Sequence, residues 1–190
     1  MNDIVISGLC VAFGDKKVFD GRSFRFVGGA ITCVGGPSGS GKTTLLNVIA
    51  GLIRAGSGEI TGVPGKISYI FQENRLFDDF TAVRNLRIAC GSAADKEKIV
   101  RHLTALGLEN DLDKPVREFS GGMKRRVAIA RAVLYDSGLI LMDEPFKGLD
   151  EKLKLSVMDY VLENRNGRTV ICVTHDPDEA KYMGAEYMTL

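Results

Sequence analysis

The chain has 190 residues, of which 45% are hydrophobic and 26% are charged, and its formal net charge is +1 at pH 7. This balance is typical of a globular domain, and the near-neutral charge gives no electrostatic reason to expect binding to nucleic acid or to an anionic membrane surface. The sequence has no run of roughly 18 apolar residues that could cross a bilayer, and its beginning does not resemble a signal peptide. We therefore expect a soluble, cytoplasmic protein.

Apolar runs alternate with amphipathic stretches along the chain. The predicted strands cover residues 4–13, 23–27, 30–34, 66–71, 139–142 and 169–173, with a candidate last strand at 187–190. The predicted helices cover residues 43–50, 81–89, 94–106, 123–135 and 153–164. Ser92 and Asp95 resemble a capping box at the third of these helices. The alternation predicts an α/β fold with a mainly parallel sheet, in which ligands bind at the carboxyl ends of the strands.

A glycine-rich loop lies between the strand at 30–34 and the first predicted helix. It matches the pattern G-x-x-x-x-G-K-[ST] in the residues Gly36, Pro37, Ser38, Gly39, Ser40, Gly41, Lys42 and Thr43. The glycines let successive N–H groups point at phosphate oxygens, and the helix adds its positive N-terminal end. Lys42 would bring charge to the β- and γ-phosphates, and Thr43 a hydroxyl to Mg²⁺. The loop alone predicts a P-loop NTPase and leaves kinases, GTPases, helicases and transport ATPases open.

Two acidic residues, Asp143 and Glu144, end a later apolar strand. The pattern is typical of a Walker B element, in which Asp143 holds Mg²⁺ directly or through water. Glu144 would then lie near the γ-phosphate and could polarise the attacking water. An apolar run that ends in two acids is common, so this interpretation depends on the phosphate loop being present as well.

A third segment, residues 119–123, reads Phe-Ser-Gly-Gly-Met and precedes a predicted helix. Ser120, Gly121 and Gly122 would open that helix, so its free N–H groups and its dipole form a second anion site. The simpler interpretation is that Ser120 only caps the helix. Together with residues 124–132, the segment resembles the signature motif of ABC ATPases, usually Leu-Ser-Gly-Gly-Gln.

The resemblance to ABC ATPases covers essentially the whole chain and implies roles for further residues. Gln72 matches the Q-loop glutamine, a contact to Mg²⁺, the γ-phosphate and water, and His175 matches the switch histidine at the γ-phosphate. Asp150 matches the end of the D-loop, a contact across a dimer, and Thr44 adjoins the phosphate loop in the nucleotide site. Phe13 stands where the family places an aromatic that stacks on adenine, or it packs within a hairpin.

The resemblance also implies an architecture. We expect one domain over residues 1–190, with a RecA-like P-loop NTPase core, an N-terminal antiparallel β lobe and an inserted helical lobe over about residues 76–124. Two subunits, either two copies of this chain or this chain and a homologous ATPase, would meet head to tail with ATP between the phosphate loop of one and the signature motif of the other. The chain ends soon after His175, so we expect a near-minimal ATPase without a regulatory domain.

The resemblance further implies that the chain energises a membrane transporter through a separate permease, at the inner face of the cell membrane and with a substrate-binding protein. Residues 68–77 resemble those of nitrate, sulfonate and taurine importers. Leu76, Phe77 and Phe80 would contact a permease helix, or they are core residues of the helical lobe. One alternative is a non-transport ABC ATPase that drives a membrane partner in cell division or lipoprotein release. Another is a soluble ABC protein of DNA repair or translation, which the lack of basic tracts disfavours.

Overall fold

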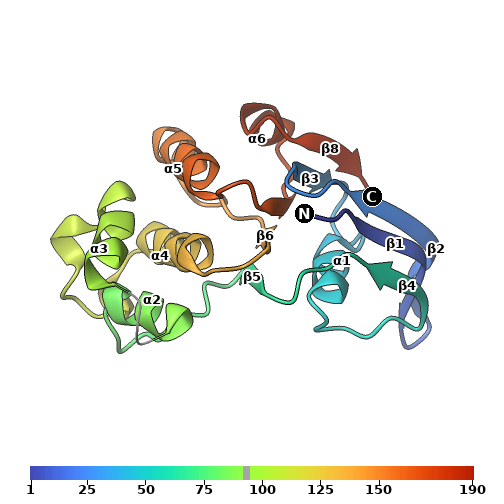
Figure 1. Cartoon of the computed structure of the whole chain (residues 1–190), viewed down its shortest axis with the longest axis horizontal. Coiled ribbons are helices and arrows are strands. Elements are labelled where there is room, and N and C mark those ends of the chain that lie inside the picture. The colour runs from blue at the N-terminus through green and yellow to red at the C-terminus, as the bar shows by residue number, and fades with distance from the viewer. Residues whose placement is uncertain (92–94) are drawn as a thin grey trace. The chain divides into compact units, whose positions relative to one another are not determined.

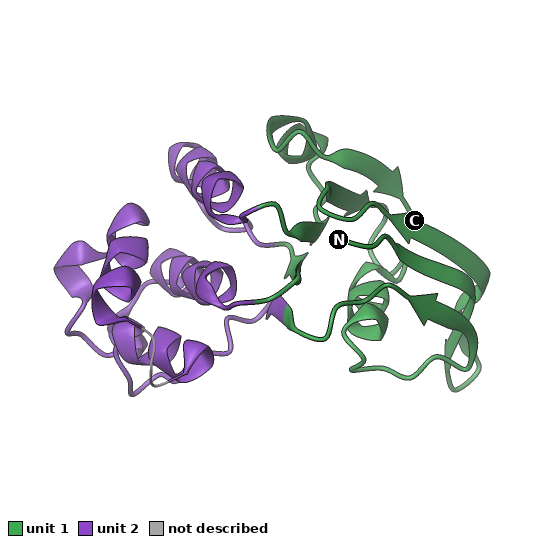
Figure 2. Ribbon diagram, viewed as in Figure 1, with its two compact units in different colours: residues 1–67, 137–144, 167–190 green, residues 68–136, 145–166 purple. Residues whose placement is uncertain are grey.

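The computed structural model describes residues 1–91 and 95–190. The chain forms two compact units, each built from separate stretches of sequence (Figure 2). Unit 1 comprises Met1–Ile67, Ser137–Glu144 and Gly167–Leu190, and unit 2 comprises Ser68–Asp136 and Pro145–Asn166. Ser92, the first residue of the predicted capping box, lies outside the described residues, and Asp95 is itself the N-cap of the next helix.

An antiparallel sheet in the order β2-β1-β4 forms one part of unit 1 (Figure 1). Its strands are β1 (Ile4–Phe13), β2 (Lys16–Phe26) and β4 (Ser57–Thr61). Ile4 and Ile6 of β1 are buried while Val5 between them is exposed, as in a sheet with one covered face. The sheet confirms the predicted N-terminal β lobe. No apolar alternation marks β4, most of which is exposed, and this is why the sequence pattern does not predict it.

The parallel strands of unit 1 run in the order β6-β7-β3-β8. They are β3 (Ile31–Gly35), β6 (Leu139–Asp143), β7 (Thr169–Val173) and β8 (Glu186–Thr189). Every residue of β3, β6 and β7 is buried, as their largely apolar sequences predict. Helix α1 (Lys42–Ile49) packs on β6 and β7, and the short helix α6 (Pro177–Tyr182) packs on β3 and β8. The parallel sheet confirms the predicted α/β class.

Unit 2 is mainly helical, and β5 (Ile67–Ile70) leads into it from unit 1. Its helices are α2 (Ala82–Cys90), α3 (Lys96–Ala105), α4 (Gly121–Leu134) and α5 (Glu151–Asn164), with 3-10 helices η1 (Glu109–Asp111) and η2 (Val116–Glu118). Helix α4 packs against α2, α3 and α5. Its residues Val127 and Ile129 are completely buried, so α4 supplies the centre of the core of this unit.

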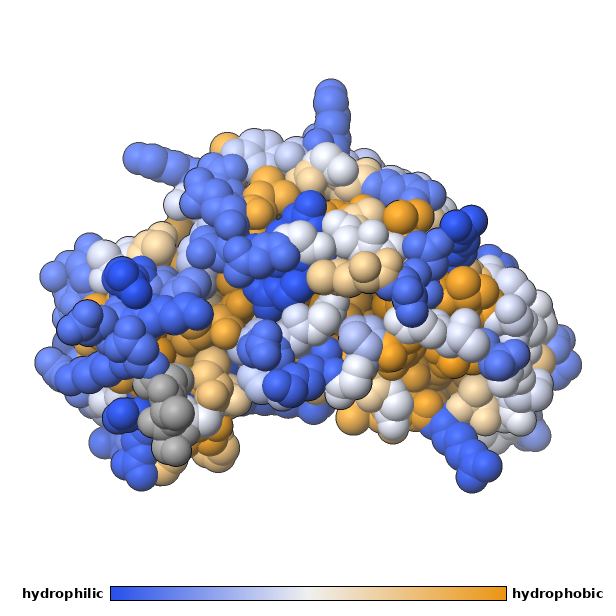
Figure 3. Space-filling model, viewed as in Figure 1, coloured by the Kyte–Doolittle hydropathy of each residue, from blue (hydrophilic) through white to orange (hydrophobic). Residues whose placement is uncertain are grey.

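Hydrophilic side chains dominate the surface shown in Figure 3, with apolar atoms visible between them. Phe13 and Phe77 are large apolar residues that stay more than half exposed, at 52% each. Among the helices that the structure describes, none combines the length and the apolar character needed to cross a membrane.

Candidate active site

The loop between β3 and α1 depends on glycine for its shape. Gly36, Gly39 and Gly41 all have positive φ angles, of 130°, 80° and 101°. A Cβ atom on Gly41 would lie 2.7 Å from Cγ1 of Val18 and 2.8 Å from Cζ of Phe19, so both the backbone angle and the space require glycine there. Within the described chain no side chain caps α1, and its first N–H groups are available to an anion.

Lys42 lies inside the curve of this loop and is only 6% exposed. Its Nζ atom donates to the carbonyl oxygens of Gly36 at 2.9 Å and Pro37 at 2.8 Å. An ammonium group has three donors, so the side chain is held in place by two of them and can offer another to a ligand. The loop therefore presents a fixed positive charge together with its backbone amides.

Ser40 adds an observation that the sequence pattern cannot give. Its Oγ atom is buried, and among the described residues it has no hydrogen-bond partner. Buried hydroxyl groups are nearly always hydrogen-bonded, so an unsatisfied one in a phosphate-type loop fits a bound oxyanion. This hydroxyl and the ammonium of Lys42 supply donors of the kind that a phosphate chain needs.

Thr43 and Asp143 are two of the three residues that the sequence predicts as contacts to Mg²⁺, and the third, Gln72, belongs to unit 2. The Thr43 hydroxyl donates to Oδ2 of Asp143 at 2.8 Å, so the first turn of α1 and the end of β6 meet here. Mg²⁺ prefers hard oxygen ligands and commonly uses one or two carboxylates with water and phosphate oxygens. Among the described residues no cluster of three His, Cys, Asp or Glu side chains occurs, and the Thr43–Asp143 pair fits Mg²⁺ rather than a metal held entirely by protein ligands.

Glu144 and His175, predicted from separate motifs, are in direct contact. Nε2 of His175 lies 2.9 Å from Oε1 of Glu144, and the Glu144 side chain is 10% exposed. Glu144 has a φ of 48°, an unusual value for a residue other than glycine, and its N–H donates to the carbonyl oxygen of Val173 at 3.0 Å. Non-glycine residues in this region carry conformational strain that is common at functional sites. The end of β6 is thus turned sharply to bring an acid to the loop after β7.

Two buried polar residues, Thr174 and Glu179, position the loop that carries His175. The Thr174 hydroxyl donates to Oε2 of Glu179 at 2.6 Å and accepts from the N–H of Asp176 at 3.0 Å. Both residues are at least nine-tenths buried. Sequence reasoning missed both residues, because a buried hydrogen bond between two side chains is not visible in a one-dimensional pattern. The only signal in the sequence is that a polar residue stands on each side of the histidine.

The signature segment begins α4 in unit 2. Ser120 is the N-cap, and its Oγ atom accepts from the N–H of Met123 at 3.2 Å, so Ser120 does cap the helix. This cap leaves the N–H groups of Gly121 and Gly122, the first two residues of the helix, unoccupied, and these two glycines have no side chain that could cover the amides. An ideal Cβ on Gly122 would lie 3.5 Å from Cδ2 of Leu149, and one on Gly121 would meet none of the described atoms within 4 Å.

The remaining predicted residues are found in both units. Gln72 is exposed after β5 in unit 2, and Asp150 is the N-cap of α5, where its Oδ1 atom accepts from the N–H of Leu153 at 3.0 Å. Phe13 ends β1 in unit 1 and keeps its ring largely exposed, which favours a role in stacking over packing within the hairpin. Thr44 lies in the first turn of α1. Unit 1 therefore holds the phosphate loop, the Thr43–Asp143 pair and the Glu144–His175 pair.

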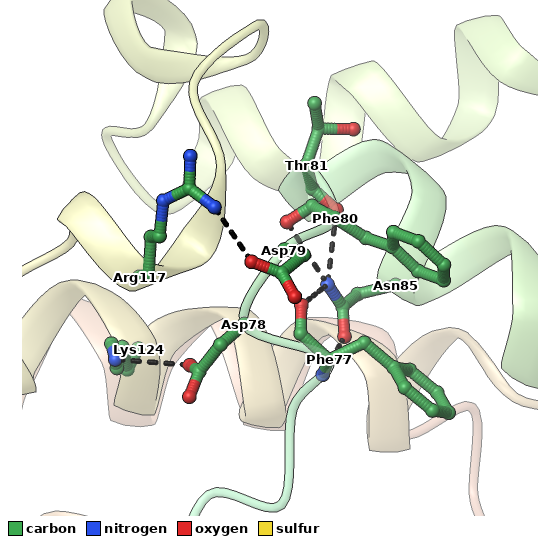
Figure 4. Close-up of polar contacts among 8 residues, drawn as sticks. All are labelled: Phe77, Asp78, Asp79, Phe80, Thr81, Asn85, Arg117 and Lys124. Atoms are coloured by element: carbon green, nitrogen blue, oxygen red, sulfur yellow. Dashed lines mark hydrogen bonds and ion pairs between the residues drawn. The ribbon is translucent and has the colours of Figure 1, made fainter.

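The segment after Gln72 is held rigidly by Asn85 of α2, which is 1% exposed (Figure 4). The Asn85 amide accepts from the N–H of Phe77 at 2.8 Å and donates to the carbonyl oxygens of Phe77 at 3.0 Å and Thr81 at 3.1 Å. Ion pairs Asp78–Lys124 and Asp79–Arg117, of 3.1 Å and 2.6 Å, lie at the same turn (Figure 4).

The aromatic residues of this turn face outward to different degrees. Phe77 is 52% exposed, so it is not a core residue of the helical lobe. Phe80 lies 5.7 Å from Phe77 between ring centroids and is covered by the guanidinium of Arg84 at 3.7 Å. Figure 4 shows both rings beside the turn that Asn85 organises. The turn thus presents one largely uncovered apolar side chain, that of Phe77, whose backbone is hydrogen-bonded to Asn85.

Comparison with known proteins decides the family. Residues 19–147 match the family described as "ABC transporter". The chain belongs to this family. It is 33% identical to the aliphatic sulfonates import ATP-binding protein SsuB 1 of Pseudomonas syringae pv. syringae, over 94% of this chain and 76% of that protein. It is 38% identical to the taurine import ATP-binding protein TauB of Roseobacter denitrificans, over the whole chain and 78% of that protein.

Solved structures agree with this membership. The dimeric structure of MJ0796, a bacterial ABC transporter cassette, matches with a TM-score of 0.86 and 26% identity, over 98% of this chain and 94% of that one. A bacterial Atm1-family ABC exporter matches in fold, with a TM-score of 0.85 at 20% identity over 94% of this chain and 35% of that one. The chain is an ABC transporter ATP-binding domain with a RecA-like P-loop fold, and ATP is its ligand.

Proposed function

We propose that this chain is the ATP-hydrolysing subunit of an ABC importer and works with a separate membrane permease. The observation that carries the hydrolytic part is the contact of Glu144 with His175 at the same sheet edge as the phosphate loop. Support for import comes from the relatives, which are named as sulfonate and taurine import ATP-binding proteins. On this proposal residues 1–190 act as one ABC ATPase domain, and the helical lobe of about residues 76–124 belongs to unit 2.

The phosphate loop binds the β- and γ-phosphates in this proposal. Lys42, Ser40 and the amides of residues 36–44 donate to the phosphate oxygens, with Thr44 as the last contact. Thr43 and Asp143 hold Mg²⁺, with Gln72 as a further contact, and the metal neutralises phosphate charge when it is bound. The exposed ring of Phe13 stacks on adenine.

Glu144 polarises the attacking water in this proposal, because its largely buried carboxylate directly follows β6, whose last residue, Asp143, contacts Thr43 at the end of the phosphate loop. His175 orients this carboxylate through the 2.9 Å contact and offers its ring to the γ-phosphate. The Thr174–Glu179 hydrogen bond fixes the loop on which His175 stands. Gln72 completes the set as a contact to the water and the γ-phosphate.

A second ATPase copy completes the site. Ser120, Gly121 and Gly122 of one subunit contact the ATP held by the phosphate loop of the other, and Asp150 contacts the partner across the interface. The uncovered amides at the start of α4 support this role because a helix N-terminus favours a polyanion. ATP then stabilises the dimer by mass action, and hydrolysis weakens it. The likeness to a cassette solved as a dimer supports this arrangement.

The permease is the partner that we propose for the turn after Gln72. Phe77 is the exposed apolar contact, and Asn85 holds its backbone in place. The chain would then work at the cytoplasmic face of the cell membrane, with a substrate-binding protein delivering cargo to the other side of the permease. Nucleic acid has no role in this proposal.

Affinity purification of the tagged chain from its native membranes tests this proposal. We expect a multi-span permease and a substrate-binding protein in stoichiometric amounts. Recovery of a cell-division or lipoprotein-release membrane partner would support the alternative of a non-transport ABC ATPase, and recovery of ribosomes would point to a translation factor. Either of these results would overturn the importer proposal.

A further inference from the structure

The guanidinium of Arg125 is buried within unit 2. The residue is 5% exposed and lies in the second turn of α4, just after the signature glycines. Arginine stays charged at any physiological pH, and a buried charge is tolerated only when its donors meet acceptors. The backbone that supplies those acceptors is therefore held firmly to α4.

The acceptors come from two segments that are distant in sequence. The Nε atom donates to the carbonyl oxygen of Pro145 at 2.8 Å. The Nη1 atom donates to the carbonyl oxygen of Phe71 at 2.5 Å, with longer contacts of 3.4 Å to the carbonyl of Gln72 and to Oδ1 of Asn74. One side chain thus holds the backbone around Gln72 and also the residue that directly follows Glu144.

Two other arginines of α4, Arg126 and Arg131, also donate to backbone carbonyl oxygens, but to different ones from those that Arg125 contacts. Arg131 donates to the carbonyl oxygens of Arg75 at 2.7 Å and Asn74 at 3.1 Å, which further fixes the segment after Gln72. Arg126 instead donates to the carbonyl oxygen of Leu106 at 2.6 Å, in the loop that follows α3. Arg126 also donates to the carbonyl oxygens of Gly107 at 3.2 Å and, within its own helix, Gly122 at 3.4 Å. None of its hydrogen bonds to the described residues reaches residues 71–75 or 145–149, so it is a neighbouring arginine that does not hold those segments.

We infer that Arg125 is a positioning residue for ATP hydrolysis, which links the signature helix to the backbone at Gln72 and to the residue after Glu144. The inference rests on the proposed function, which gives Gln72 and Glu144 their roles. A planar guanidinium can donate in two directions at once, whereas a lysine ammonium on a flexible stem cannot hold both sides in the same way. Arg125 bonds to the backbone that carries Gln72 and follows Glu144, and the proposed function gives it no contact to ATP. Its loss should therefore slow turnover more than it weakens ATP binding.

Steady-state ATPase assays and calorimetry with Mg-ATP on the purified full chain test this role. In Arg125→Gln we expect kcat to fall about tenfold or more, since small misplacements of reacting groups have large effects, while the Kd for ATP stays within about threefold. Arg126→Gln is the matched control and should keep kcat within about threefold. Arg125→Lys should fall between the parent and Arg125→Gln.

Hydrogen exchange of residues 71–75 and 145–149 gives a second readout, which also applies if turnover of the isolated chain is slow. Both segments should exchange faster in the Arg125 variants than in Arg126→Gln. Equal exchange in all variants, equal kcat in Arg125→Gln and Arg126→Gln, or a rise in Kd that accounts for the whole loss of activity would overturn the inference. If Arg125→Gln does not fold, Arg125→Lys is judged by the same criteria.

Glu144→Gln separates failure of this inference from failure of the proposed function. If Glu144→Gln turns over like the parent, the proposed function is wrong whatever the Arg125 variants do. If Glu144→Gln is inactive while Arg125→Gln and Arg126→Gln have the same kcat, only the role of Arg125 is wrong.

Discussion

The ammonium of Lys42 is the residue-scale feature on which nucleotide binding depends. The carbonyl oxygens of Gly36 and Pro37 hold this ammonium in a buried position. In a Lys42 variant, no mobile lysine from another part of the chain would therefore supply the same fixed charge to the phosphates. We expect Lys42→Ala to raise the Kd for ATP by about 30-fold or more, because a charge-assisted hydrogen bond contributes about 2 kcal/mol. Calorimetry measures this, with the exposed Lys152→Ala as control, and unchanged ATP affinity in Lys42→Ala would contradict the assignment.

Gly41 sets the shape of the loop through both its angle and its surroundings. A methyl group there would be strained at φ 101° and would press against Val18 and Phe19. Gly41→Ala should therefore lower the free energy of unfolding by about 2–4 kcal/mol, from strain and overpacking together. Gly167→Ala, at φ 71° with nothing within 4 Å among the described residues, carries the backbone strain alone and should cost about 1 kcal/mol. Equal losses in urea unfolding would show that the contacts do not matter.

At the scale of elements, the side-chain amide of Asn85 organises residues 77–81 of the turn after Gln72. Asn85→Ala would leave the N–H of Phe77 without its side-chain acceptor, while the carbonyl oxygens of Phe77 and Thr81 would keep only their backbone bonds to the N–H groups of Phe80 and residue 85. We expect the variant to lower the free energy of unfolding by about 1–3 kcal/mol. Asp79→Asn removes a surface ion pair at the same turn and should cost less than about 1 kcal/mol. Denaturant unfolding of both variants tests the contrast, and a similar loss in each would refute the role of Asn85.

Elements with a strong apolar pattern were predictable, and those without one were not. The buried strand Thr169–Val173 has the predicted bounds, because a wholly buried parallel strand leaves a continuous apolar run. β4 is mostly exposed, and α6 is short and begins Pro-Asp-Glu, so neither carries a periodic signal. Helix α4 begins at Gly121 rather than at Met123, since the two glycines of the signature motif are themselves helical.

The sequence motifs name candidate site residues, but they do not give the contacts between those residues. The motifs name Thr43, Asp143, Glu144 and His175, and the structure adds that they meet in pairs. The buried bonds of Arg125 could not be predicted, because they join segments that no local spacing relates.

At the scale of the whole molecule, the candidate residues are divided between two units of one chain. The phosphate loop, the Thr43–Asp143 pair and the Glu144–His175 pair belong to unit 1, and Gln72 and the signature segment belong to unit 2. A second copy of the chain would supply its signature segment to this phosphate loop. The account therefore predicts that ATP binding and association of two subunits are linked.

Glu144→Gln tests this central claim most directly, because it keeps the shape of the side chain and removes its charge. Turnover should fall by about a hundredfold or more while ATP binding persists, and light scattering should detect a dimer that Mg-ATP stabilises. Glu163→Gln, an exposed acid on α5, serves as the control. Steady-state turnover of Glu144→Gln within a few-fold of the parent, with no ATP-dependent dimer, would contradict the account.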